Sequence, residues 1–191
     1  MRLISGRRFS GSFFNNKLNI SFGEQVIYTG ENRNYEIFYL NPAIPYVFAA
    51  YEDNDLDVGN KNNDNSMIFF DGSYLMGRKY LIYFEFIIDD IQIYNDPVQD
   101  MLGTKIGAKS ETNIFGFFID WEAEYTEIDT WTYIHSGRGQ FTSWENLSHP
   151  IGYPYGGDLK SIRVSSQAWL KRDRLSIETI YNCRGDRANY R

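Results

Sequence analysis

Apolar and polar residues alternate along most of this chain, which is typical of β-strands whose two faces meet different surroundings. In Tyr80–Gln92, for example, Tyr80 and Phe84 fall on one face, while the acidic residues Glu85 and Asp89 fall on the other. The same period predicts strands at Arg2–Phe14, Leu18–Tyr28, Ser66–Met76, Tyr80–Gln92, Gly103–Ser110, Asn113–Thr126, Asp158–Leu170 and Leu175–Arg184. No window has a convincing 3.6-residue period, although Tyr35–Tyr51 could hold a helical turn. The sequence therefore predicts an all-β protein.

The predicted strands are long, and the connections between them are sorted by length. Several strands have 11–14 residues, whereas about 5–6 is typical of globular proteins and roughly 9–11 is enough to cross a membrane. Short turns are predicted at Asn15–Lys17, Gly77–Lys79, Glu111–Thr112 and Lys171–Arg174, and they alternate with long connections at Gly30–Asn65, Ile93–Leu102 and Glu127–Gly157. This order indicates an antiparallel transmembrane β-barrel with short periplasmic turns and long extracellular loops. The fold of a soluble β-sandwich does not require short and long connections to alternate.

The direction of the strands predicts a barrel larger than this chain. If the short turns are periplasmic, the strand before Asn15 begins on the outer side and the strand that ends at Arg184 runs outward. Bacterial barrels have an even number of strands, so residues 1–191 are expected to be a single barrel segment, truncated at both ends, of about 16–18 strands in all. Truncation would also explain why MRLISGRRF lacks the apolar core of a signal peptide. A soluble fold of eight strands is the alternative.

Composition argues against several classes of binding partner and structural feature. Aromatic residues make up 17% of the chain, and the formal net charge is −6, which argues against nucleic acid because binding it needs a clustered basic face. Cys183 is the single cysteine, so it has no partner for an internal disulfide and no spacing for a metal site. No run of 18 apolar residues suggests a transmembrane helix.

Several short motifs resemble the Wzi-like capsule assembly family of outer-membrane barrels, in its non-enteric branch. The similar stretches, in family order, are SGRRF (Ser5–Phe9), FGEQVIYTG (Phe22–Gly30), YLNPAIPY (Tyr39–Tyr46), FEFIIDD (Phe84–Asp90), EYTEIDTWTYIH (Glu124–His135), HPIGYPYGGD (His149–Asp158) and RGD (Arg184–Asp186). The resemblance covers the middle to C-terminal part of the family barrel. It implies a protein of the outer membrane of a Gram-negative bacterium that contacts lipid and takes part in assembling or attaching cell-surface polysaccharide. It implies glycan binding without catalysis, no cofactor, and a monomer.

The loop after the sixth predicted strand carries the candidate glycan-binding residues. Flat rings can stack on the apolar face of a sugar, while polar side chains bind its hydroxyls. The candidates are Trp131, Tyr133, His135, Arg138, Trp144, His149, Tyr155 and Asp158. The alternative is that the aromatic residues form an interfacial girdle or fold the loop back into the lumen as a plug.

Carboxylates repeat along two of the predicted strands and are expected to face a polar lumen. They are Glu85, Asp89, Asp120, Glu122 and Glu124, and the cations expected opposite them are Arg7, Arg8, Lys160 and Arg163. Paired carboxylates about 5–9.5 Å apart also serve glycoside hydrolysis. That spacing arises from any two acids at i and i+2 on a strand, so a hydrated wall is the preferred interpretation.

Two further patterns lack the set of ligands that a metal site needs. Glu52–Asn65 carries Asp53, Asp55 and Asp57, as a calcium loop would, but Val58 occupies the position of the sharp-turn glycine and no glutamate closes the loop. His135 and His149 lie fourteen residues apart without cysteine or an HExxH pattern. No metal and no catalytic residue is predicted.

The barrel hypothesis predicts which side chains meet lipid. Phe115, Phe117, Ile119 and Trp121 are expected on the lipid side of one strand, opposite its acids. Alternatives are a soluble β-sandwich lectin or adhesin, which would have closed cores on both sheets, and a general porin with an open lumen. A carbohydrate-active enzyme would need two carboxylates across a cleft.

Overall fold

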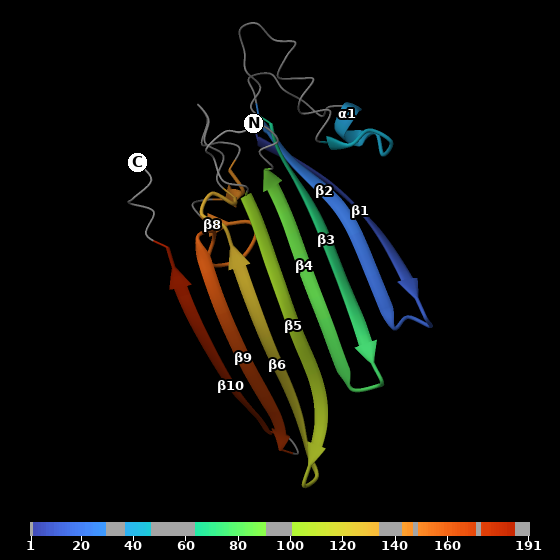
Figure 1. Ribbon diagram of the computed structural model, residues 1–191, viewed down its shortest axis with the longest axis vertical. Coiled ribbons are helices and arrows are strands. Elements are labelled where there is room, and N and C mark those ends of the chain that lie inside the picture. Colours follow the sequence, from blue (N-terminus) through green and yellow to red (C-terminus); the bar gives the residue numbers. More distant parts are fainter. Residues whose placement is uncertain are drawn as a thin grey trace, which may run out of the picture.

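The computed structural model describes residues 2–29, 37–46, 64–90, 101–133, 143–146, 149–170 and 173–185. Eight strands form one antiparallel sheet in chain order (Figure 1). They are β1 (Arg2–Phe13), β2 (Leu18–Thr29), β3 (Asn65–Met76), β4 (Tyr80–Asp90), β5 (Met101–Ile114), β6 (Phe117–Ile128), β9 (Leu159–Leu170) and β10 (Asp173–Arg184). A two-residue pair, β7 (Glu145–Asn146) and β8 (His149–Pro150), and one helical turn, α1 (Ile37–Leu40), complete the elements. The predicted all-β class, the eight strands and the helical turn are confirmed.

The turns between β1 and β2, β3 and β4, and β5 and β6 lie at one end of the sheet, here called the hairpin end, together with the end of β9 and the beginning of β10 (Figure 1). The beginning of β1 and the end of β10 lie at the opposite end, here called the loop end (Figure 1). Each strand pairs only with its neighbours in the order, and within the described part of the chain β1 and β10 are the two edges of an open sheet.

The turn between β5 and β6 lies four residues later than predicted. Ile114 pairs with Phe117, so the turn consists of Phe115 and Gly116 rather than Glu111–Thr112. Both turn residues have positive φ, 54° and 84°, as a two-residue type I′ hairpin requires. The Asn113 carboxamide oxygen accepts the Gly116 N–H at 3.1 Å. The expectation of one strand over Asn113–Thr126 was therefore wrong, because Phe115 and Gly116 form a turn near the beginning of this range.

Replacing Phe115 with asparagine is expected to stabilise the sheet by about 1 kcal/mol, because the left-handed region costs an ordinary L-residue about 1–2 kcal/mol and asparagine less. The urea midpoint of unfolding measures the change, and Gly116→Ala, at φ 84°, should lower it. Phe115 is 96% exposed, so a loss of stability in Phe115→Asn would mean that its ring has an apolar contact.

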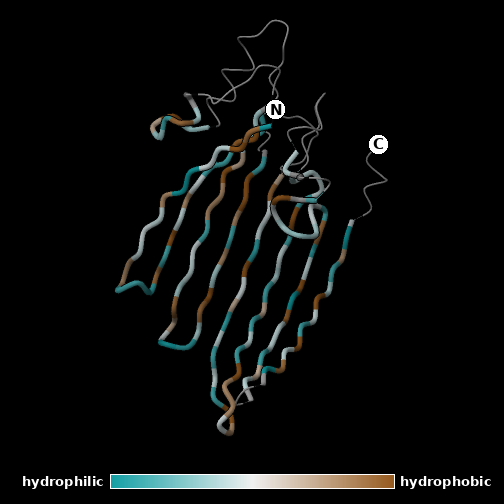
Figure 2. Tube along the Cα trace, turned by 180° about the vertical axis from the view of Figure 1, so that it is seen from behind, coloured by the Kyte–Doolittle hydropathy of each residue, from teal (hydrophilic) through white to brown (hydrophobic). Residues whose placement is uncertain are grey.

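The strand register separates the side chains into two faces of opposite character, and hydropathy alternates along each strand (Figure 2). The apolar face is formed by rows such as Phe22–Phe70–Phe86 and Ala108–Ala123–Val164. The polar face includes Asp71, Tyr83, Glu85, Lys105, Lys109, Glu122, Glu124 and Arg163. Many large apolar-face side chains are exposed, including Phe84, Ile106, Ile162 and Ile177. A sandwich would cover such a face with a second sheet, which the described residues do not supply.

Burial is concentrated at the loop end, in one cluster on each face. On the polar face, Ile27, Met67 and Ile128 pack with Tyr133 and Trp144. On the apolar face, Val26 and Tyr28 pack with Tyr39, Tyr46 and Leu3. The two clusters use alternate residues of β2, so both faces of this strand are covered at the same height.

Glu24 interrupts the apolar row of β2, and the second cluster shows why. Its carboxylate pairs with the Arg7 guanidinium and accepts the Tyr46 N–H at 2.6 Å. Arg7 also donates to the carbonyl oxygen of Ile44 at 2.7 Å. Residues 39–46 thus cover a buried ion pair on the apolar face, which stays tolerable because both charges are bonded.

Two of the four expected cations lie on the apolar face rather than opposite the acid rows. Arg7 pairs with Glu24, and Lys160 pairs with Glu127 at 2.7 Å. Both lie on the same strand face as the apolar residues. Residues 39–46 cover the Arg7–Glu24 pair, whereas the Lys160–Glu127 pair is exposed. In the part of the chain that the structure describes, no helix is long and apolar enough to cross a membrane.

Candidate functional site

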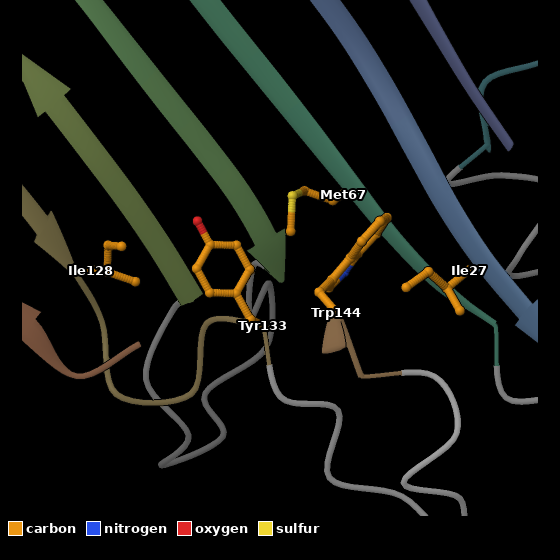
Figure 3. Close-up of a cluster of buried hydrophobic side chains, with 5 residues drawn as sticks. All are labelled: Ile27, Met67, Ile128, Tyr133 and Trp144. Carbon is orange, nitrogen blue, oxygen red and sulfur yellow. The ribbon is translucent and has the colours of Figure 1, made fainter. Parts of the chain in front are cut away.

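A cap formed by residues 129–133, 143–146 and 149–158 covers the loop end of the polar face. Its Tyr133 and Trp144 rings lie between Ile128 and Ile27, beside Met67 (Figure 3). These three aliphatic residues come from β6, β2 and β3, so the cap bridges strands that are not neighbours. The cap therefore belongs to the packed core at this end of the sheet.

Asp89 of β4 is the main polar anchor of the cap. Its carboxylate accepts the backbone N–H of Tyr133 at 2.7 Å and the indole N–H of Trp144 at 3.1 Å. The residue is 8% exposed, so these bonds replace the water that the carboxylate gives up. Burial raises the pKa of Tyr133 to about 12, because the phenolate would lose its hydration.

A second anchor ties the base of the cap to β5. The Asp129 N–H donates to the Leu102 carbonyl at 2.9 Å, and the Asp129 carboxylate accepts the Leu102 N–H at 3.1 Å. The Thr132 hydroxyl donates to the same carbonyl at 3.0 Å. A Cβ on Gly157 would lie 2.7 Å from the Thr132 carbonyl oxygen, so the cap closes this tightly only with glycine there.

The predicted glycan-binding residues do not form one exposed site. Tyr133 and Trp144 are 3% and 2% exposed, and Trp131 and Asp158 are half-buried, while His149 and Tyr155 are exposed. His135 and Arg138 lie outside the described residues. Of the six candidates that the structure describes, Tyr133 and Trp144 are the two that meet in the core cluster. Their burial leaves almost none of either ring exposed, which corrects the expected role as stacking surfaces and agrees with a loop folded back onto the sheet, although both residues border the groove described below.

The five predicted acids lie on the polar face, but they make different hydrogen bonds and ion pairs. Asp89 holds the cap, whereas Glu122 accepts from Lys109 at 2.9 Å and lies 3.7 Å from Arg163. Tyr83 places its hydroxyl 2.7 Å from Glu122 and 3.0 Å from Glu124. Asp120 lies 3.4 Å from the Trp169 indole nitrogen, and Glu85 pairs with Lys105 at 3.1 Å. Of the expected cations, Arg163 does face the acid rows, and Arg8 pairs with Asp71 at 2.7 Å.

A groove runs over the polar face beside the cap. It consists of two adjoining pockets of about 290 and 390 Å³ that share Glu85, Ile87, Tyr133 and Gly152. Lys105 and Tyr153 line the smaller pocket, and Arg8, Phe69 and Asp71 line the larger. The groove therefore combines aromatic rings with two ion pairs.

Sequence reasoning missed Phe69 and Lys105 as site residues. Phe69 is an apolar residue at a polar-face position of β3, opposite Gly23, and that break in alternation was the available signal. Lys105 lies in the predicted strand with the weakest pattern, so its face could not be assigned. Phe69 of β3 and Lys105 of β5 come together beside the cap because both strands pair with β4.

Among the residues described, no group of three His, Cys, Asp or Glu side chains could hold a metal ion. The acidic loop with Asp53, Asp55 and Asp57 lies outside them. Compared with known proteins, the chain matches no family model, no curated protein and no solved structure.

Proposed function

We propose that this chain is part of an outer-membrane β-barrel of the Wzi-like capsule assembly type, which binds cell-surface polysaccharide without catalysing a reaction. One observation carries the proposal: a single sheet of long antiparallel strands has an exposed apolar face, a charged opposite face, and, among the described residues, its tight turns at one end. A transmembrane barrel needs these three features together. The motif resemblance supplies the connection to polysaccharide.

The height of the apolar face fits a membrane. On β6, apolar-face residues run without a charge from Phe117 to Tyr125, and the eight steps of about 3.4 Å between them span about 27 Å along the strand. A tilt of about 40° reduces this to about 20 Å, close to the band of about 25 Å in outer-membrane barrels. Glu127 and its partner Lys160 lie beyond the band at the loop end.

The open edges also need an explanation. β1 and β10 each present a row of 12 residues at an edge of the sheet, and such long edges invite pairing with other chains. Closure by further strands would remove both edges and turn the polar face into a lumen wall. The predicted total of about 16–18 strands remains part of the proposal.

The polar face suits glycan contact better than free conduction. The cap occupies its loop end, and the groove beside the cap offers rings and paired charges. The acids on this wall have hydrogen-bonding or ionic partners, which suits a hydrated surface. An open porin would lack a cap held by a buried carboxylate.

Quenching of tryptophan fluorescence by brominated lipid tests the membrane orientation. Trp121 lies on the apolar face and Trp169 on the polar face, so single-tryptophan variants folded into vesicles report one face each. The bromines are expected to quench Trp121 strongly and Trp169 weakly. Equal quenching, or a soluble fold that never enters vesicles, would rule out the proposed barrel and favour a soluble protein whose apolar face packs on protein.

A further inference from the structure

The groove contains the same pair of features twice. In the larger pocket, Phe69 lies near the ion pair of Arg8 and Asp71, which are 2.7 Å apart. In the smaller pocket, Tyr153 lies near the ion pair of Lys105 and Glu85, which are 3.1 Å apart. Glu85 and Ile87 border both pockets. Each half therefore combines a half-buried aromatic ring, Phe69 or Tyr153, with one pair of opposite charges.

Phe69 is held in place by a glycine on the neighbouring strand. A Cβ on Gly23 would lie 2.2 Å from the Cζ of Phe69 and 2.6 Å from the carbonyl oxygen of Arg7. Only glycine lets the ring extend across β2 at this point, and the half-buried ring lines the larger pocket. The ring is thus fixed against the sheet and offers a flat apolar surface to the groove.

Tyr153 is fixed by the cap and the sheet together. Its hydroxyl lies 3.2 Å from the Ser161 hydroxyl of β9, and the Lys105 ammonium lies 5.7 Å from the centre of its ring. The ring is half-buried, so part of its surface lines the smaller pocket. A ligand in this pocket would meet an apolar surface on one side and a lysine–glutamate pair on the other.

The charges of the groove indicate the class of ligand. Its two cations and two anions are paired with each other, so neither sign is in excess. The carboxylates accept hydrogen bonds and the cations donate them, which suits hydroxyl groups because each hydroxyl can do both. An acidic sugar would find Arg8 and Lys105 already paired with Asp71 and Glu85, and it would have to compete with these carboxylates for the cations.

We propose that the groove binds two consecutive uncharged sugar units of a linear glycan, one at Phe69 and one at Tyr153. The ion pairs bind the hydroxyl edges of the sugars, and the rings cover their apolar faces. The two pockets, at 290 and 390 Å³, are at the lower end of the size range of ligand pockets, as expected for one unit each. The assignment rests on the proposed glycan role and adds its place and its charge class.

Calorimetric titration of the whole chain, folded into detergent micelles, tests the assignment. The probes are neutral hexasaccharides of gluco, galacto and manno configuration, with hexagalacturonate as the acidic counterpart. Phe69→Leu should weaken neutral binding about two- to tenfold, the usual value of an aromatic contact. The matched control is Phe84→Leu, because Phe84 lies on the apolar face and its loss should leave binding unchanged. Glu85→Gln removes the partner of Lys105 and should strengthen hexagalacturonate binding about two- to fivefold.

The outcomes separate the groove from the wider function. Neutral binding that is insensitive to Phe69→Leu and Glu85→Gln would place the glycan elsewhere and overturn the groove, while leaving the glycan role intact. Preference of the unaltered chain for hexagalacturonate would overturn the charge class alone. No binding of any probe would overturn the groove and the glycan role together, and lipid quenching of Trp121 would still decide the barrel.

Discussion

Replacing Asp89 with alanine is expected to release the cap from the sheet, at a cost of about 3 kcal/mol in local stability, since hydrogen bonds to charged groups contribute about 1.5–3 kcal/mol each. The change leaves the Tyr133 N–H and the Trp144 indole N–H without their buried acceptor. Hydrogen exchange of the Trp144 indole proton, measured by NMR in micelles, should become about a hundredfold faster. This is the change in exchange rate that follows when the free energy of local opening falls by about 3 kcal/mol.

Asp120→Ala is the control, because Asp120 lies on the same face but is only half-buried and makes a single long contact with Trp169. Exchange at Trp144 should not change in this variant. If Asp89→Ala leaves the indole proton as protected as before, apolar packing of Trp144 against Ile27 and Met67 holds the cap without the carboxylate.

An arginine at Val164 should destabilise the membrane-inserted sheet by about 2–4 kcal/mol, the cost of a cation on the lipid side near the bilayer midplane. Val164 pairs with Ala123 on the apolar face and is exposed. The neighbouring Ser165 pairs with Glu122 on the polar face, so Ser165→Arg places the same side chain beside carboxylates and should cost little. Urea titration of folding into vesicles measures both variants on one scale.

Equal losses of stability in the two variants would contradict a lipid-facing apolar side. In a membrane barrel, a single charge costs much more stability on the lipid side than on the lumen side. A loss in Ser165→Arg alone would reverse the assignment of the faces. The comparison needs no assumption about the number of strands that close the sheet.

Alternation alone located the eight strands, because a strand with two different environments repeats every two residues whatever its neighbours are. The pattern failed at the turn between β5 and β6 for a local reason. Phe115 continues the apolar alternation of Phe117 and Ile119, but Gly116 and the Asn113 side chain favour a tight turn there. Local turn chemistry overrode the hydrophobic period.

The candidate site was less accessible to sequence reasoning, because burial is a property of several segments at once. The loop with Tyr133 and Trp144 was singled out for its aromatic residues, yet these two rings meet Ile27, Met67 and Ile128 from three strands of the sheet. Similarly, Glu24 looked like a defect in β2 until residues 39–46 supplied Tyr46 and covered its pair with Arg7. Neither contact can be predicted from the alternation of apolar and polar residues within one strand.

The sequence by itself determined the all-β class, the long strands, the polarity of their two faces and the sorting of short and long connections, since each follows from the order of neighbouring residues. Only the tertiary structure decided that the aromatic loop is a cap rather than an exposed binding loop. It also decided that Asp89 is an anchor and that Phe69, Tyr153 and two ion pairs share a groove. These features depend on register across strands, which is set by pairing between segments and not by the pattern within any one of them.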